Sequence, residues 1–290
     1  MCQSIVLEKT SSFKKYLLFS LAVWMLCQVF SPTQITAQGN LLLMPRRIVF
    51  EGAKRYEEIN LANTGIDTAR YIVSFMQIRM REDGGFEEIK QPDSGQNFAD
   101  RYLRFFPRTV SLSPNEAQIV KIQLTRTNEL QPGEYRSHLY FRAIPTEKPL
   151  GDKDAVKDTV ISVKLVAVFG ISIPVIIRVG EYTTKVELSN LSLDRPKDLA
   201  PILNMTINRT GNMSVYGDIT VDYISPAGKT TRVGTVNGLA VYTPTLKRQH
   251  HMELLKIAGI DYHSGKLHID FKKQAEEKSL EIAEGDLPLN

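Results

Sequence analysis

The sequence predicts an all-β protein. From Arg47 onward, short alternating or wholly apolar runs are separated by turn residues, and sustained 3.6-residue periodicity is nearly absent. The separating segments carry turn chemistry, as in Asn63-Thr64-Gly65, Ser113-Pro114-Asn115 and Gln131-Pro132-Gly133. Without a leader of 37 residues the chain would have about 253 residues, a length that favours two domains.

Residues 1–37 predict a secretory signal peptide that is cleaved after Ala37. Three lysines precede a fifteen-residue apolar run, Tyr16 to Phe30, and small residues follow it. The alternative is a retained membrane anchor, but a spanning helix needs about 20 apolar residues. A lipid anchor on Cys27 is disfavoured because no small residue precedes this cysteine. We therefore expect a protein that works outside the cytoplasm, without a stable membrane anchor.

Charge and cysteine content limit the function classes. Removal of residues 1–37 takes away three basic residues and one acidic residue, which lowers the formal charge from +4 to +2. A nucleic-acid partner usually requires a concentrated basic face, which this balance does not favour. Both cysteines leave with the leader, so the mature chain would depend on packed cores rather than disulfides.

The strands of the first predicted domain, residues 40–179, follow one another closely. Seven strands over about 130 residues, without helical stretches for crossovers, favour an immunoglobulin-like sandwich. The predicted strands are Arg47 to Phe50, Glu57 to Ala62, Ala69 to Met80, Leu103 to Phe106, Ala117 to Thr125, Arg136 to Ala143 and Val160 to Ile173.

A second β-rich domain is predicted over residues 180–271. The charged stretch 272–290 has little to bury, and we interpret it as a fraying tail. The predicted strands of the second domain are Leu203 to Ile207, Asp218 to Tyr223, Thr230 to Val233, Met252 to Leu255 and Leu267 to Phe271.

The run Val160 to Ile173 is longer than an ordinary strand of five or six residues. Its first half alternates, with Ser162 and Lys164 on the face opposite to the apolar residues. One interpretation is a last strand covered by the second domain. The other is an open edge to which a partner adds its own strand, with the apolar row filling the partner's groove. The residues alone leave both open.

Motifs that would indicate catalysis or metal binding are weak. No nucleophile–base pair or paired carboxylates stand out, so we expect no enzyme and no cofactor. Gly228-Lys229-Thr230 lacks the rest of a phosphate-binding loop and is typical of a hairpin turn. His250 and His251, with His263 and His268, suggest a metal cluster, but adjacent strand residues point to opposite faces. The segment Arg101 to Phe106 is better explained by a half-buried strand than by base stacking.

Several segments in the same order resemble the periplasmic chaperones of bacterial chaperone-usher systems. The first is Arg47 to Gly52, and the second runs from Phe106-Pro107-Arg108 to Ile122. The third is Pro132 to Pro145, followed by the long strand that leads into Ile173-Pro174-Val175-Ile176. The later run Asn208 to Asp218 is similar to the second domain of one branch of this family.

The resemblance implies two immunoglobulin-like sandwiches in a boomerang arrangement and a non-enzymatic chaperone of fimbrial or pilus subunits. In such proteins the chaperone lends a strand to an incomplete subunit until the outer-membrane usher receives it. The resemblance implies that Arg47 binds the terminal carboxylate of the subunit. The side chains lent to the subunit would be those of Ile161, Val163, Leu165, Ala167 and Phe169.

One departure from the family pattern concerns a second basic residue, which should lie shortly before Pro174. Residues 169–173 contain no basic side chain, so either Arg47 acts alone or another cation replaces the missing lysine. The resemblance leaves open whether the free protein caps itself as a dimer. The alternative function is a secreted adhesin or binding module, although the single tryptophan, Trp24, lies in the leader.

Overall fold

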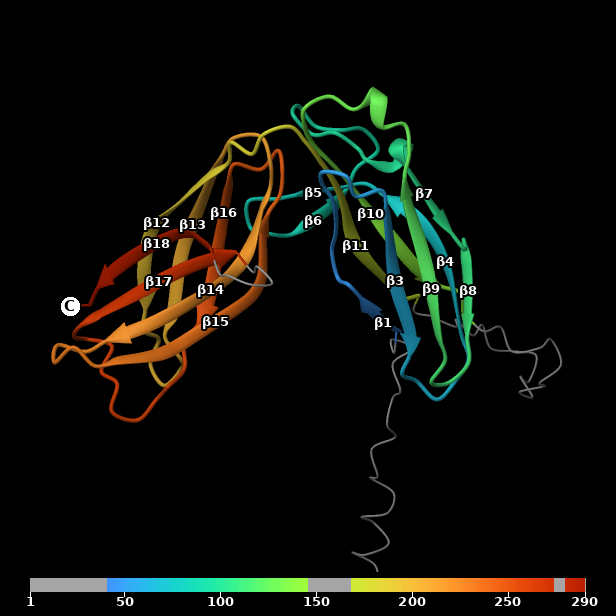
Figure 1. Cartoon of the computed structure of the whole chain (residues 1–290). Helices are drawn as coiled ribbons and strands as arrows, with labels where there is room; N and C mark the ends of the chain where they lie inside the picture. The colour runs from blue at the N-terminus through green and yellow to red at the C-terminus, as the bar shows by residue number, and fades with distance from the viewer. Residues whose placement is uncertain (1–40, 146–167, 274–279, 290) are drawn as a thin grey trace, which may run out of the picture. The chain divides into compact units, whose positions relative to one another are not determined.

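The computed structural model describes residues 41–145, 168–273 and 280–289, all of which belong to one compact unit. The described residues contain two short 3-10 helices, Asp100–Tyr102 and Thr127–Glu129, and otherwise only strands and loops. The predicted all-β fold is confirmed (Figure 1).

The first sandwich consists of two sheets. One has the strand order β1-β3-β9-β7 and the other the order β2-β11-β10-β4-β8. Their strands are β1 (Leu41–Met44), β2 (Ile48–Phe50), β3 (Tyr56–Asn63), β4 (Ala69–Met76), β7 (Leu103–Phe106), β8 (Thr109–Leu112), β9 (Ala117–Leu124), β10 (Gly133–Ala143) and β11 (Gly170–Val179). A separate hairpin is formed by β5 (Ile78–Met80) and β6 (Phe86–Glu88).

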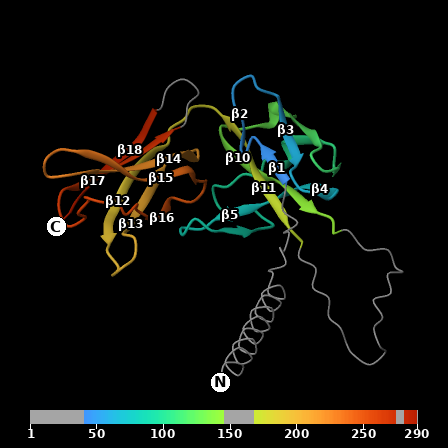
Figure 2. The same ribbon diagram turned by 90° about the horizontal axis from the view of Figure 1, so that it is seen from below.

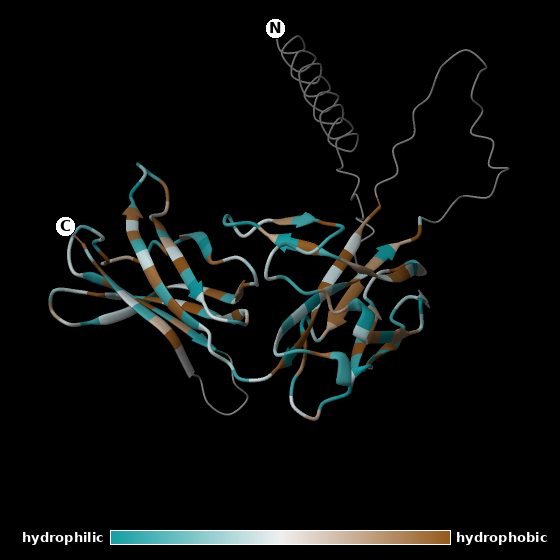
Figure 3. Cartoon of the chain, turned by 90° about the horizontal axis from the view of Figure 1, so that it is seen from above, coloured by the Kyte–Doolittle hydropathy of each residue, from teal (hydrophilic) through white to brown (hydrophobic). Residues whose placement is uncertain are grey.

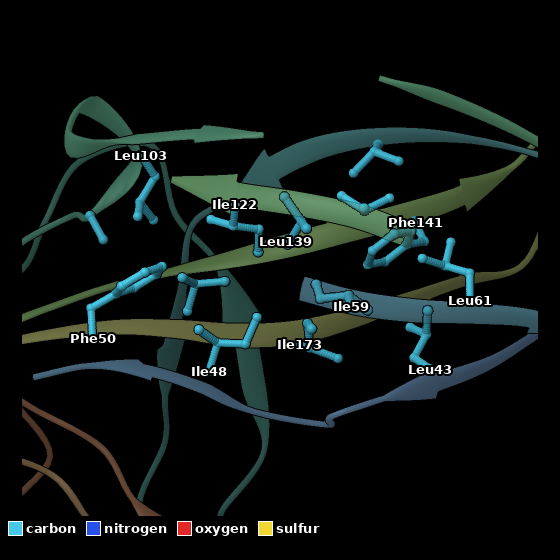
Figure 4. Close-up of a cluster of buried hydrophobic side chains, with 14 of the residues drawn as sticks. Leu43, Ile48, Phe50, Ile59, Leu61, Leu103, Ile122, Leu139, Phe141 and Ile173 are labelled. Atoms are coloured by element: carbon cyan, nitrogen blue, oxygen red, sulfur yellow. The ribbon is translucent and has the colours of Figure 1, made fainter. Parts of the chain in front are cut away.

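Alternation of side chains explains how these sheets form a core. In β9, Val120, Ile122 and Leu124 are buried, whereas the residues between them are exposed. Side chains from both sheets point toward one another in Figure 4, where Ile59 and Phe141 are among the labelled core residues. Each such side chain stabilises the fold by roughly 1.5–3 kcal/mol when it is removed from water.

The second sandwich has a three-stranded sheet, β12-β13-β16, and a four-stranded sheet, β15-β14-β17-β18. Figure 2 shows its strands from another direction, and Figure 3 shows hydrophobic and hydrophilic residues alternating along strands of both sandwiches. The strands are β12 (Lys185–Asp194), β13 (Ile202–Thr210), β14 (Val215–Ile224), β15 (Thr230–Val241), β16 (Lys247–Glu253), β17 (Lys266–Lys273) and β18 (Leu280–Pro288).

The structure differs from the sequence prediction at the end of the chain. The stretch predicted as a fraying tail contains β18, which pairs in antiparallel fashion with β17. Ile282, Leu287 and Leu289 pack against the second core. A strand with one solvent face needs few apolar residues, so its charged residues concealed it in the sequence.

Other strands were also missed. β1, β6, β8 and β12 do not appear in the prediction. A register shift between Ser189 and Ser192 interrupts the alternation of β12 in the middle of the strand, where Asn190 has a φ of 53°. The predicted strand Val160 to Ile173 lies mostly outside the described residues, and its described part begins at Gly170 and continues to Val179.

Candidate functional site

The two halves of β11 have different neighbours. On one side, β11 pairs with β10 from Gly170 to Val179. On the other side, β2 pairs in parallel with Val175 to Ile177 only. Within the described parts of the chain, no strand pairs with that side of residues 170–174. The first half of β11 is therefore an open edge with unpaired backbone groups.

Side chains along this edge become more exposed toward its start. Ile173 is 3% exposed and belongs to the first core, Ile171 is partly buried, and Phe169 is 45% exposed. These three residues share one face because strand side chains alternate. Phe169 accepts a backbone hydrogen bond from Ala143, so pairing with β10 extends to this residue. Of the predicted subunit-binding residues, Ile161, Val163, Leu165 and Ala167 lie outside the described residues.

Gly170 permits close packing at the start of this edge. A Cβ at this position would lie 2.3 Å from atoms of the Tyr140 ring, on the neighbouring strand β10. Any larger residue would displace the ring or the strand, so glycine fits a sterically restricted position here.

Arg47 lies immediately before β2, where the chain crosses from one sheet of the first sandwich to the other. Its guanidinium carbon is 4.5 Å from the centroid of the Tyr216 ring and 5.8 Å from that of Tyr242. Its Nη1 atom is buried and has no hydrogen-bond partner among the described residues. Burial lowers the pKa of Arg47, and the positive charge of Arg178 lowers it further. An incoming anion would supply the missing partner.

Three ionisable side chains alternate along one buried face of β10. They belong to Glu134, Arg136 and His138, each at most 3% exposed. Arg136 Nη2 donates to the carbonyl oxygens of Ile78 and Thr243, and its guanidinium lies 4.5 Å from the Tyr242 ring centroid. Burial lowers the pKa of Arg136 and, together with Arg136, lowers the pKa of His138 to about 3.

Glu134 accepts hydrogen bonds from three other residues, Ser214, Arg178 and Thr243. Its Oε2 accepts from the backbone N of Ser214 at 2.9 Å, from Ser214 Oγ at 2.7 Å and from Arg178 Nε at 3.2 Å. Its Oε1 accepts from Thr243 Oγ1 at 3.3 Å. Arg178 also donates to the carbonyl oxygen of Ser214, so its guanidinium is engaged on both sides.

Arg178, like Glu134, is a site residue that the sequence did not predict. The family pattern places the second cation before Pro174, where the predicted strand ends. Because β11 continues to Val179, alternation places Pro174, Ile176 and Arg178 on one face. Arg47 and Arg178 both line a pocket of about 500 Å³ that also contains Tyr182, Tyr216 and Lys273.

The structure also locates the other sequence motifs. Gly228 and Lys229 lie in the turn between β14 and β15, and Gly228 has a φ of 82°. On β16, His250 is partly buried whereas His251 is exposed and contacts Asn204, so the two adjacent histidines differ in environment. In the basic segment, Leu103 is buried and Arg104 is exposed, as expected for a half-buried strand.

Among the described residues, no helix is long and apolar enough to cross a membrane. No protein-family model matches the chain, and no curated protein matches it.

Solved structures do match. The YadV chaperone is 12% identical with a TM-score of 0.43, and the match covers 86% of this chain and 100% of that chain. The Pseudomonas aeruginosa CupB2 chaperone is 11% identical with a TM-score of 0.41, again over 86% and 100%. The Salmonella enterica SafA pilin in complex with the SafB chaperone gives 13% identity and a TM-score of 0.40, over 89% and 99%. Two of these structures are chaperones, and the third is a chaperone in complex with a pilin.

Proposed function

We propose that this chain is a periplasmic chaperone that captures subunits of fimbriae or related surface fibres by strand addition and passes them to an outer-membrane usher. The observation that carries the proposal is the open edge at residues 170–174, with which no described strand pairs. This edge leads to Arg47, whose Nη1 atom has no hydrogen-bond partner among the described residues. Backbone groups on such an edge pair with an added strand, and side chains at alternate positions provide specificity.

The parallel pairing of β2 supports a direction for the client strand. β2 begins to pair at Val175, whose partner is Ile48, and Arg47 directly precedes Ile48. A client strand that occupies the same side of residues 170–174 and runs parallel to β11 would therefore end at Arg47. Its terminal carboxylate would accept charge-assisted hydrogen bonds from the guanidinium. Arg178, the second cation of the pocket, adds positive charge there.

The side chains of Ile161, Val163, Leu165, Ala167 and Phe169 would fill the groove of the client. Like Ile171 and Ile173, which face the first core, they occupy odd-numbered positions, so a continuous strand would place them on the same face. Each large apolar side chain would contribute on the order of 1.5–3 kcal/mol before the costs of association. No chemical step or cofactor is needed for this exchange of strands. Cleavage of the leader after Ala37 would deliver the protein to the periplasm.

Capture by an affinity-tagged chain tests the strand that is lent. We expect Leu165→Glu to abolish recovery of fibre subunits from periplasmic extract, as identified by mass spectrometry, because a charge would enter the apolar groove. Lys164→Glu is the matched control, since the alternation of a strand would place its side chain on the opposite face, so capture should persist. Equal capture by both variants, or recovery of an unrelated folded ligand instead, would favour a binding module.

The carboxylate anchor is tested with a synthetic peptide of the last ten residues of the captured subunit. Unmodified chain should bind the free-acid peptide about 10- to 100-fold more tightly than the C-terminally amidated peptide, as expected for a charged hydrogen bond worth roughly 1.5–3 kcal/mol. Arg47→Met should remove this preference. A preference that survives in Arg47→Met would assign the anchor to another cation, with Arg178 as the first candidate.

A further inference from the structure

The outer face of β17 and β18 brings a histidine and three carboxylates together. His268 and Asp270 are two residues apart on β17, so their side chains share a face. The register of β18 places Asp286 opposite His268 and Glu284 opposite Asp270. One ligand atom from each of His268, Asp270 and Glu284 lies within 4.8 Å of the other two.

The orientation of the His268 ring is set by Asp286. His268 Nδ1 lies 2.7 Å from Asp286 Oδ1, while Lys266 Nζ donates to Asp286 Oδ2 at 2.8 Å. When Nδ1 carries the proton and donates it to Asp286, the lone pair of Nε2 faces Asp270, whose Oδ1 is 3.5 Å away. A carboxylate that holds the far nitrogen of a histidine in this way is the usual outer-shell partner of a metal-binding imidazole.

Asp270 is the most buried residue of this cluster. Its residue is only 8% exposed, and its Oδ2 accepts from Lys272 Nζ at 2.8 Å. Its Oδ1 faces His268 instead, and Glu284 lies directly across from it on β18. Like charges directly opposite on neighbouring strands destabilise a sheet, and a bound cation would reduce the repulsion between Asp270 and Glu284. His268, Asp270 and Glu284 are close enough for one cation to contact all three.

We propose that His268 Nε2, Asp270 and Glu284 bind a divalent transition-metal ion of the Zn²⁺ type, with Asp286 as the positioning residue for His268. Two ligand atoms 3.5 Å apart, each about 2.1 Å from a metal ion, subtend about 113° at the metal, near the tetrahedral value of about 109°. An imidazole ligand favours Zn²⁺ over Mg²⁺ or Ca²⁺, which prefer oxygen atoms alone. The bound ion would fasten β18, the last strand of the chain, to β17.

Isothermal titration of EDTA-treated mature chain with ZnCl₂ tests this site. One equivalent should bind, and MgCl₂ should give no saturable heat. His268→Gln and Glu284→Gln should each weaken Zn²⁺ binding at least about tenfold, and Asp286→Asn about 10- to 100-fold, as is typical for loss of an outer-shell partner. His263→Gln is the matched control, because His263 also contacts a carboxylate, that of Asp261, but outside this cluster.

A second readout does not depend on heats of binding. Zn²⁺ should raise the unfolding temperature of the unmodified chain and of His263→Gln, but not that of His268→Gln. Glu284 is exposed, so Glu284→Gln should fold normally even if a change at His268 disturbs the sheet. Absence of Zn²⁺ binding to the unmodified chain at 1:1 stoichiometry, or binding that survives in both His268→Gln and Glu284→Gln, would overturn the proposal and leave a network of salt bridges only.

Discussion

The two halves of β11 combine different surroundings in one strand. Residues 175–177 pair with β10 on one side and with β2 on the other, and Arg178 joins Glu134 and Ser214 in a buried network. Among the described strands, only β10 pairs with residues 170–174, and side-chain exposure increases toward Phe169. The covered half is expected to support stability, whereas the open half is expected to support binding. The two halves of one strand can therefore have different roles, because packing of the covered half fixes the position of the open half.

Loss of the Glu134 carboxylate should produce the largest change in stability. Glu134→Gln would leave Arg178 buried without the carboxylate of its ion pair and would remove the negative charge that acts on Arg136. Removal of one partner of a buried ion pair costs about 3–5 kcal/mol, so the free energy of unfolding in urea should fall by that amount. Glu58→Gln is the control, since its pair with Lys121 is exposed and should contribute about 0–1 kcal/mol. Equal effects in the two variants would show that the network does not hold the covered half.

Acid should weaken the fold through His138, which pairs with Pro174 at the junction between the two halves. Its folded-state pKa of about 3 lies below the ordinary value of 6.5, so the unfolded state binds more protons between these values. Stability is therefore retained above pH 6.5 and lost as pH falls, by about 1.4 kcal/mol per pH unit and about 2 kcal/mol between pH 6.5 and pH 5.

Urea unfolding at several pH values checks this slope. His138→Phe keeps the ring contacts with Phe86 and Tyr242 and should remove that part of the slope. His250 has a pKa lowered to about 4 and should still contribute in the variant. An unchanged slope in His138→Phe would place the acid sensitivity elsewhere.

The smallest change in stability is expected in the open half. Phe169→Ala should alter the free energy of unfolding by less than about 0.5 kcal/mol, because the side chain is 45% exposed. Capture of a client subunit should nevertheless weaken severalfold, as measured in the same affinity experiment as Leu165→Glu. A large loss of stability together with normal capture would reverse the assignment of the two halves.

Alternation and turn chemistry were sufficient to predict the all-β fold, whereas Arg47 was singled out only by its place in a segment that resembles a family motif. They failed where a strand had an irregularity or a solvent face. The register shift within β12 and the charged residues of β18 interrupt the alternation of apolar and polar residues from which a strand is predicted. Arg178 and Glu134 were missed for another reason. Their roles depend on contacts with Ser214, 36 and 80 residues further along the chain, which no local pattern encodes.

Pro174 separates the two halves of β11 and has no N–H group to donate. For the proposed client strand, Pro174 would fix the position at which pairing with β11 ends. The paired residues would extend from Pro174 back toward residue 170. A client whose tail were one residue longer would shift its register by one and turn its apolar side chains to the wrong face of the sheet. If the proposed function holds, clients would then be selected by tail length as well as by side-chain chemistry.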